Sequence, residues 1–323
     1  MWTIGFLSRA RVDFLAIRRW AWGLSAALIV PGMVWLALQG ITYSIEFTGG
    51  SMVHVRTVDG VGADQLRGAM RAAGLGSAEI QRFGSDREYV IRARLDGTTG
   101  EDGGMEAVTA AVDAALEREL GAGTYQLGRT GGVGPKVSSE LQQKALIAIG
   151  VSFATTLIYL AFRFEWRFGL VAVLATAHDI LATVAFIRYL DLEVSLVVVA
   201  AILTVLGYSL NDTIVIFDRV RGNLRRRGKR GFADVLNASI NETLPRTVLT
   251  GGTTIATALV LSFFAGTVIK PFALVMSFGI VVGTFSSIFV APPILCWIVE
   301  QARVPRDVEP ALDRGLGSGH VEA

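Results

Sequence analysis

The feature that most restricts the fold of this 323-residue chain is a set of six long apolar stretches. Each has about the 20 residues that an α-helix needs to cross the hydrocarbon core of a bilayer. The stretches cover residues 20–39, 145–162, 168–188, 194–217, 247–268 and 272–299. Only 18% of the residues are charged, against about 25% in soluble domains. The pattern predicts an α-helical integral membrane protein with six transmembrane helices.

The first stretch could be mistaken for a signal peptide, because Arg18 and Arg19 precede it. Its apolar run is longer than a signal core, and no small-residue cleavage site follows it. We therefore interpret residues 20–39 as the first transmembrane helix and residues 1–19 as a cytoplasmic N-terminal segment.

Lysine and arginine predict the orientation, since basic residues beside a transmembrane helix stay in the cytoplasm. The basic clusters are Arg9, Arg11, Arg18 and Arg19; Arg163 and Arg167; Arg219, Arg221, Arg225, Arg226, Arg227, Lys229 and Arg230; and Arg303 and Arg306. Six spans with both termini in the cytoplasm place all four clusters on that side. Residues 218–243 then form a basic cytoplasmic loop within the helical region 142–300, and residues 301–323 form a cytoplasmic tail. Such a loop fixes topology and contacts membrane lipids, or it binds a cytoplasmic partner.

The connection after the first helix, residues 40–141, is long enough to fold as a separate exoplasmic domain. Its pattern predicts a strand over 51–57, a helix over 64–73, strands over 79–83 and 88–95 around a turn at 84–86, a helix over 105–120 and a strand over 123–127. The order β-α-β-β-α-β is that of a small ferredoxin-like α+β domain.

Asp212 lies inside the fourth apolar stretch, where a carboxylate costs about 2.5–3.5 kcal/mol even on the more lenient insertion scale. Such a residue usually moves protons or ions, or it has a charged partner. Arg246 directly precedes the fifth stretch, which enters the membrane from the side where the fourth stretch ends. We therefore expect Arg246 and Asp212 to lie at a similar depth in the membrane. Asp179 in the third stretch is also expected to face the interior. We predict that Asp212 and Arg246 form a proton relay, with a purely structural ion pair as the alternative.

Other polar residues of the spans recur at helical spacing. The stripes are Ser152, Thr155 and Tyr159; Thr176, Asp179 and Thr183 with His178 beside them; Tyr208, Ser209 and Asp212 with neighbours Asn211 and Thr213; and Arg246, Thr250, Thr253 and Thr257. Together they suggest a polar lining inside the bundle. For the hydroxyl groups alone, bonding to their own backbone is the more ordinary explanation, as close helix packing is for Gly279 and Gly283. Asp218, Arg219 and Arg221 mark the cytoplasmic end of the fourth span, where we expect them to extend to the membrane surface.

Several classes of function lack their sequence signals. The net charge of +2 is too small to suggest nucleic acid as a partner, and the single cysteine, Cys296, excludes an intrachain disulfide. We find no phosphate-binding loop, no nucleophile triad and no metal-ligand spacing. We therefore expect no enzymatic activity, no cofactor and no metal, and an ion gradient as the source of energy.

Four motifs resemble those of the SecF family of bacterial protein-export membrane subunits. Residues 207–221 read Gly-Tyr-Ser-Leu-Asn-Asp-Thr-Ile-Val-Ile-Phe-Asp-Arg-Val-Arg, like the family's fourth span, and residues 241–250 read Asn-Glu-Thr-Leu-Pro-Arg-Thr-Val-Leu-Thr, like its fifth. The other two motifs are His178-Asp179 and, after the first helix, Phe47, Thr48, Gly49 and Gly50. Three positions depart from the family: Glu46 replaces an aspartate, for which we expect little consequence, Gly222 replaces a glutamate, and Pro245 precedes Arg246.

The resemblance implies a multi-pass protein of the bacterial cytoplasmic (inner) membrane that pairs with a SecD-like six-span subunit. It implies that the two assist the SecYEG translocon late in export, using the proton motive force to move unfolded polypeptide outward. In the family, the residues matching Asp212 and Arg246 belong to the proton pathway. Two alternatives stay open. One is a small-molecule efflux transporter of the same resistance-nodulation-division superfamily, and the other is a scaffold that transports nothing.

Overall fold

The computed structural model describes residues 12–301, except 59, 77, 84, 86, 94–102, 227 and 229. The expected turn at 84–86, the tail 301–323, the N-terminal segment and the basic loop therefore lie partly or largely outside the described residues. The chain divides into two compact units. The helical unit holds residues 1–41, 151–192 and 200–323, and the exoplasmic unit, named for its expected position, holds residues 42–150 and 193–199.

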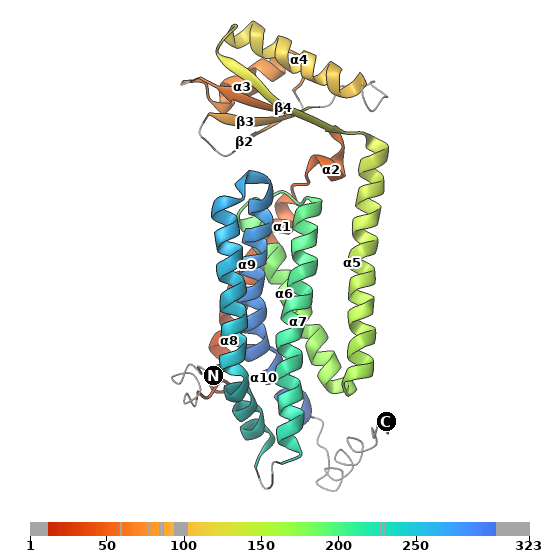
Figure 1. Cartoon of the computed structure of the whole chain (residues 1–323), viewed down its shortest axis with the longest axis vertical. Coiled ribbons are helices and arrows are strands. Elements are labelled where there is room, and N and C mark those ends of the chain that lie inside the picture. Colours follow the sequence, from red (N-terminus) through yellow and green to blue (C-terminus); the bar gives the residue numbers. More distant parts are fainter. Residues whose placement is uncertain are drawn as a thin grey trace. The chain divides into compact units, whose positions relative to one another are not determined.

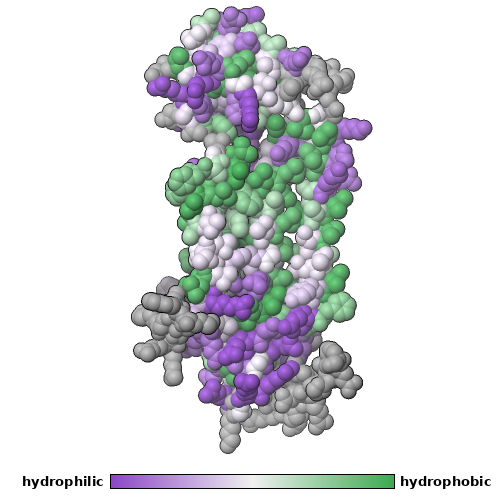
Figure 2. Space-filling model, in the orientation of Figure 1, coloured by the Kyte–Doolittle hydropathy of each residue, from purple (hydrophilic) through white to green (hydrophobic). Residues whose placement is uncertain are grey.

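The helical unit is a bundle of long helices (Figure 1). Its elements are α1 (Arg18–Gln39), α6 (Trp166–Tyr189), α8 (Phe232–Phe264), α9 (Gly266–Phe289), α10 (Ala291–Gln301) and most of α7 (Leu196–Leu224), with the second half of α5 (Pro135–Arg163). Within the described residues, six segments are long and apolar enough to cross a membrane, which confirms the predicted six spans. Figure 2 shows a surface that is largely apolar along these helices and polar toward the connection of α7 to α8.

The sixth span is not one continuous helix, contrary to the expectation for residues 272–299. Helix α9 ends at Phe289, and α10 begins at Ala291. Pro292 and Pro293 cause the break, because proline has no N–H to donate to the carbonyl four residues earlier and its ring clashes with that carbonyl. Both prolines lie in the first turn of α10, where a missing N–H costs little.

The expected basic loop 218–243 is mostly helical. Helix α7 continues to Leu224 and α8 starts at Phe232, so only seven residues connect them. The extensions form because their apolar residues recur at helical spacing: Val220, Leu236 and Ile240 are fully buried in the core of the bundle. The positive charges that predicted a loop therefore lie on helix ends and on the short connection.

The exoplasmic unit has the predicted ferredoxin-like fold. Its elements are α2 (Ile45–Thr48), β1 (Gly50–Thr57), α3 (Ala63–Ala72), β2 (Glu79–Arg82), β3 (Glu88–Ala93), α4 (Gly103–Leu120) and β4 (Tyr125–Val133). The strands form one antiparallel sheet in the order β2-β3-β1-β4. Helices α3 and α4 cover one face of this sheet (Figure 1), and Leu66, Leu116, Val53 and Ile91 fill the core between them.

The last strand is longer than the predicted 123–127. Strand β4 continues to Val133 because its glycine-rich end pairs with the start of β1, with Gly132 opposite Ser51 and Gly131 opposite Met52. Glycine has a low strand propensity, so the sequence pattern alone favoured an earlier end.

Candidate functional site

Helices α7 and α9 pack closely because two glycines of α9 leave room for the side chains of α7. A Cβ atom on Gly279 would collide with the Val205 side chain, and one on Gly283 would lie 2.7 Å from Ser209 Cβ. Real Cβ contacts are never this short, so only glycine fits at this separation. The close approach brings the hydroxyl groups of α9 beside the polar stripe of α7.

Asp179 is the centre of a buried hydrogen-bonded cluster. Its side chain is on α6, and the residue is 1% exposed. One carboxylate oxygen accepts hydrogen bonds from the hydroxyls of Ser209 on α7 and Ser286 on α9, the latter at 2.7 Å. The other oxygen lies 2.9 Å from His178 Nδ1, and His178 Nε2 lies 3.0 Å from the Ser25 hydroxyl on α1. This Asp179 cluster, formed by Ser25, His178, Asp179, Ser209 and Ser286, joins four helices at one point.

Asp212 lies one turn after Ser209 on α7 and is 3% exposed. Among the described residues it accepts one hydrogen bond, a long one of 3.4 Å from the Thr284 hydroxyl on α9. The two buried carboxylates thus have different surroundings: Asp179 has three close partners, whereas Asp212 has one weak partner. Burying a charged carboxylate with so few hydrogen bonds is costly.

The expected contact between Asp212 and Arg246 is not formed. No ion pair joins the two residues in the described part of the chain. Arg246 lies on an exposed face of α8, whereas Asp212 is buried. Sequence spacing placed both at a similar depth, but it could not give the rotation of α8 about its own axis.

The exposed face of α8 continues beyond Arg246. Thr250, Thr253 and Thr257 follow on the same exposed stripe, and each hydroxyl donates to the backbone carbonyl four residues earlier, at 2.9–3.0 Å. Thr250 therefore does not line the interior of this chain. Hydrogen bonding to their own backbone, the ordinary explanation for such hydroxyls, therefore holds here. No other helix among the described residues covers this stripe.

The remaining stripe residues divide between the interior and the surface. Thr213 is buried and Tyr208 is half-buried near Gly251, whereas Asn211 is exposed. Thr176 and Thr183 are buried and donate to the carbonyls of Ala172 and Asp179. In α5, Thr155 and Tyr159 are exposed, so the polar residues of the second span do not join the interior lining.

We expected the three charged residues at the end of the fourth span to extend to the membrane surface. In the structure they form ion pairs. Asp218 lies 2.6 Å from Arg163 and 3.7 Å from Arg221. Arg219 pairs with Glu242 on α8. These contacts connect α5, α7 and α8 within the helical unit. Partly exposed pairs of this kind are worth little individually, but a network fixes the relative positions of the helix ends.

The motif after α1 forms a one-turn helix, α2, that packs through Phe47. Gly49 and Gly50 follow with φ angles of 69° and 114°, a backbone region that favours glycine. Glu46 of this motif accepts a hydrogen bond from the backbone N–H of Leu196, the first residue of α7, at 2.6 Å. The glutamate thus satisfies one of the free N–H groups at the start of α7 and lies at the positive end of its helix dipole. The sequence alone predicts little consequence of a glutamate in place of the family's aspartate, and it does not predict this cap.

We expect Glu46→Ala to weaken the first turn of α7 by about 1 kcal/mol, the usual cost of a lost helix cap. Hydrogen exchange of the Leu196 amide in the full chain should become roughly fivefold faster. Glu165→Ala is the matched control, because Glu165 also precedes a helix, α6, but makes no capping hydrogen bond. An unchanged exchange rate at Leu196 would contradict the capping role.

The sequence patterns did not identify three residues of this region, Ser25, Thr284 and Ser286, or the capping role of Glu46. The three hydroxyl residues are single polar residues in apolar helices, which normally bond to their own backbone. A usable signal was available for Thr284 and Ser286 because they lie one and three residues after Gly283, where the close helix packing places them beside the stripe of α7. Among the described residues, no group of three or more His, Cys, Asp and Glu side chains is arranged to hold a metal ion.

Six spans, a ferredoxin-like domain inserted after the first and buried carboxylates between α6, α7 and α9 define a polytopic membrane protein with ionisable groups in its helical core. Residues 114–301 match the family model described as protein export membrane protein SecD/SecF, C-terminal. The chain is 48% identical over 314 residues to the protein translocase subunit SecF of Gemmatimonas aurantiaca, covering 96% of this chain and 93% of that protein. It is 40% identical over 290 residues to SecF of Vibrio alginolyticus, covering 90% and 88%. The chain belongs to the SecF family of protein translocase subunits.

A solved structure of similar fold supports this family assignment. The crystal structure of SecDF from Thermus thermophilus, described as a translocon-associated membrane protein, superposes with a TM-score of 0.78 at 32% identity. The match covers 94% of this chain but 40% of the SecDF chain. This chain therefore corresponds to less than half of SecDF.

Proposed function

We propose that this chain works with a SecD-like subunit in the bacterial inner membrane, where the two use the proton motive force to promote late steps of protein export through the SecYEG translocon. The observation that carries the proposal is Asp212, a buried carboxylate with one weak hydrogen-bond partner in a transmembrane helix. The names of the relatives support a role in protein translocation.

The exposed stripe of α8 supports a partner in the membrane. Arg246, Thr250, Thr253 and Thr257 lie on an exposed face that no other helix in the described part of the chain covers. An arginine facing lipid is costly, so another protein surface or an aqueous path must cover this face. The solved relative carries SecD and SecF together under one name, and the present chain corresponds to 40% of it. A six-span SecD-like subunit on this face would bring Arg246 into a protein interior.

Within such a complex, we propose that Asp212 takes up and releases the coupling proton. Burial favours the protonated carboxyl, and a nearby arginine favours the carboxylate. Arg246 always carries its charge and has a long side chain, so a small movement of α8 or the partner changes its distance from Asp212. Each charge moved across 100 mV supplies about 2.3 kcal/mol, which is enough to bias a domain movement.

The other residues then have supporting roles. The Asp179 cluster holds α1, α6, α7 and α9 around the proton site, with His178 and Asp179 as its ionisable members. Tyr208, Asn211, Thr213 and Thr250 line the path or face the partner. Glu46 and the Phe47, Gly49 and Gly50 motif connect the exoplasmic chain to the start of α7, so that movement of the exoplasmic domain and proton transfer at Asp212 are coupled. Both termini and the Asp218, Arg219 and Arg221 network lie in the cytoplasm.

Complementation of a deletion strain tests the proposal against an efflux role. We expect the gene to restore processing of an exported precursor, to lose that effect when an uncoupler collapses the proton gradient, and to leave drug susceptibility unchanged. The protein should co-purify with a SecD-like subunit. Restored drug resistance without restored export would favour the efflux transporter, and export that is insensitive to the uncoupler would favour the scaffold.

A further inference from the structure

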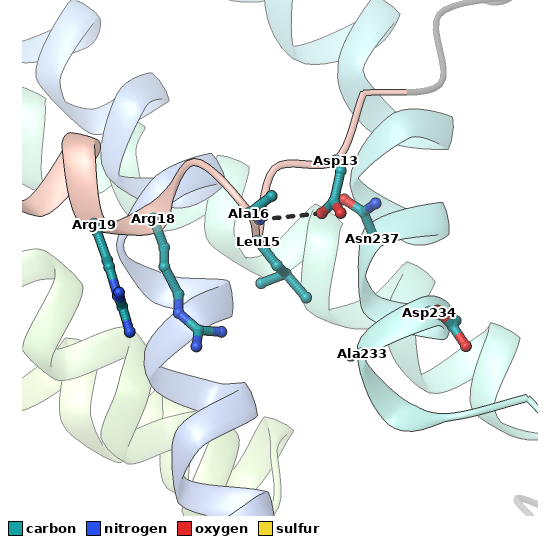
Figure 3. Close-up of a pocket in the computed structure, with 8 residues that line it drawn as sticks. All are labelled: Asp13, Leu15, Ala16, Arg18, Arg19, Ala233, Asp234 and Asn237. Carbon is teal, nitrogen blue, oxygen red and sulfur yellow. Dashed lines mark hydrogen bonds between the residues drawn. The ribbon is translucent and has the colours of Figure 1, made fainter.

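A pocket of about 420 Å³ lies where the chain enters the helical unit, between the segment before α1 and the first turns of α8 (Figure 3). Its lining residues are Asp13, Leu15, Ala16, Arg18, Arg19, Ala233, Asp234 and Asn237. The volume is within the ~300–1,000 Å³ range of small-molecule sites. None of the residues that line the pocket belongs to the Asp179 cluster, and neither Asp212 nor Arg246 lines it.

The wall formed by the N-terminal segment is fixed to α8. Asn237 accepts a hydrogen bond from the Phe14 backbone N–H at 3.0 Å, and the Asn241 amide bonds to both the N–H and the carbonyl of Val12, at 3.0 and 2.9 Å. Phe14 and Leu15 are buried in the core of the bundle. Asp13 closes the turn before α1 by accepting the N–H of Ala16 at 3.1 Å (Figure 3). These contacts hold the segment in a fixed position against α8.

The pocket contains two positive and two negative side chains on different sides. Figure 3 shows Arg18 and Arg19, from the first turn of α1, on one side, and Asp13 and Asp234 on the other. All four residues are exposed, and none of them forms an ion pair with another described residue. Opposite charges on different sides of one pocket match a ligand that itself carries a positive and a negative group.

The position of the pocket relative to the first membrane span indicates the source of this ligand. Arg18 starts the first membrane span, and Trp20, two residues later, is 83% exposed. Tryptophan on the surface at the end of a span is typical of the headgroup level of a bilayer. The nearest abundant zwitterions at that level are phospholipid headgroups.

We propose that this pocket binds the headgroup of an aminophospholipid, such as phosphatidylethanolamine. The guanidinium groups of Arg18 and Arg19 bind the phosphate, for which arginine has the matching donor geometry. The carboxylates of Asp13 and Asp234 accept hydrogen bonds from the primary ammonium group. A phosphatidylglycerol headgroup has no cation for the carboxylates, and the quaternary ammonium of phosphatidylcholine has no N–H to donate.

The test measures binding of dioctanoyl phosphatidylethanolamine, phosphatidylglycerol and phosphatidylcholine to the full chain in detergent, by native mass spectrometry and calorimetry. We expect phosphatidylethanolamine to bind roughly tenfold more tightly than either of the others, the effect of about one charge-assisted hydrogen bond. Equal affinity for the three lipids would overturn the proposal. Free phosphoethanolamine is the further arm: binding as tight as that of the lipid would overturn the assignment to a membrane lipid.

Two paired variants test the assignment of the charges. Asp13→Asn with Asp234→Asn should reverse the preference toward phosphatidylglycerol, because only the arginines then remain charged. Arg18→Gln with Arg19→Gln should weaken binding of all phospholipids roughly tenfold or more. Arg226→Gln, which removes a basic residue outside the pocket, is the control and should bind as the unmodified chain does. A retained preference for phosphatidylethanolamine in the double asparagine variant would contradict the proposal.

Discussion

Asp212→Asn is expected to abolish the stimulation of export by the proton motive force, while the protein still inserts and binds its partner. Asparagine has almost the same shape as aspartate and can still accept a hydrogen bond from Thr284, so the packing of α7 against α9 is preserved. It cannot take up or release a proton at any pH of the cell. The measurement is the rate of precursor processing in the deletion strain, with and without an uncoupler, at matched protein levels. We expect a loss of about a hundredfold or more in the uncoupler-sensitive rate, the usual effect of removing a positioned proton-transfer group.

Two further variants separate proton transfer from charge. Asp212→Glu keeps a titratable carboxyl and should retain part of the stimulation. Asp218→Asn removes the same charge from the same helix, but outside the buried region, where its partners are Arg163 and Arg221. Loss of a partly exposed pair costs about 0–1 kcal/mol, so export should be nearly normal. Full uncoupler-sensitive export in the Asp212→Asn protein would show that the proton is carried elsewhere.

Gly283→Val is expected to destabilise the helical unit more than any surface change. The first added carbon would lie 2.7 Å from Ser209 Cβ and 3.1 Å from Ser209 Cα. The Cα atom belongs to the backbone of α7, so the conflict cannot be relieved by turning a side chain, and the two helices must separate. Overpacking of this kind typically costs about 1–3 kcal/mol. Separation also moves Ser209 and Ser286 away from Asp179, so further hydrogen bonds are lost.

Thermal unfolding of the purified full chain in detergent measures this effect. Gly207→Val is the matched control, because Gly207 lies in the neighbouring helix α7 and an added Cβ there meets nothing within 4 Å. That change should be neutral or slightly stabilising, since glycine is less favourable than alanine in a helix interior by about 1 kcal/mol. Equal melting temperatures for the two variants would show that α7 and α9 are not held at the distance that Gly283 implies.

The two buried aspartates suggest a division of labour in the proposed mechanism. Besides its neighbour His178, Asp179 has partners on α7 and α9, and His178 in turn contacts Ser25 on α1, so these contacts restrict its movement. Asp212 has a single long hydrogen bond, from Thr284, so its surroundings hold it less firmly. A site that must bind and release a proton needs such variable surroundings, whereas a site that holds helices together needs constant ones. Asp179 therefore suits a structural role and Asp212 the coupling role.

The sequence alone determined the number of spans, the order of strands and helices in the exoplasmic domain and the burial of Asp179 and Asp212. These features depend on local quantities: the length of an apolar run, the alternation of a strand and the cost of a charge in hydrocarbon. The sequence also located the α8 stripe correctly on one helix face. It placed Gly279 and Gly283 at a close helix contact, and the structure shows that contact with α7.

Only the tertiary structure decided which polar groups meet. It separated Arg246 from Asp212, brought Ser25 and Ser286 to the Asp179 cluster, and showed that Glu46 caps α7. The physical reason is that helical spacing shows which residues share a face, but it contains no information on how far each helix is rotated about its axis or shifted along it. Those two quantities are set by packing between helices that are distant in sequence, and here glycine contacts and buried hydroxyls fix them.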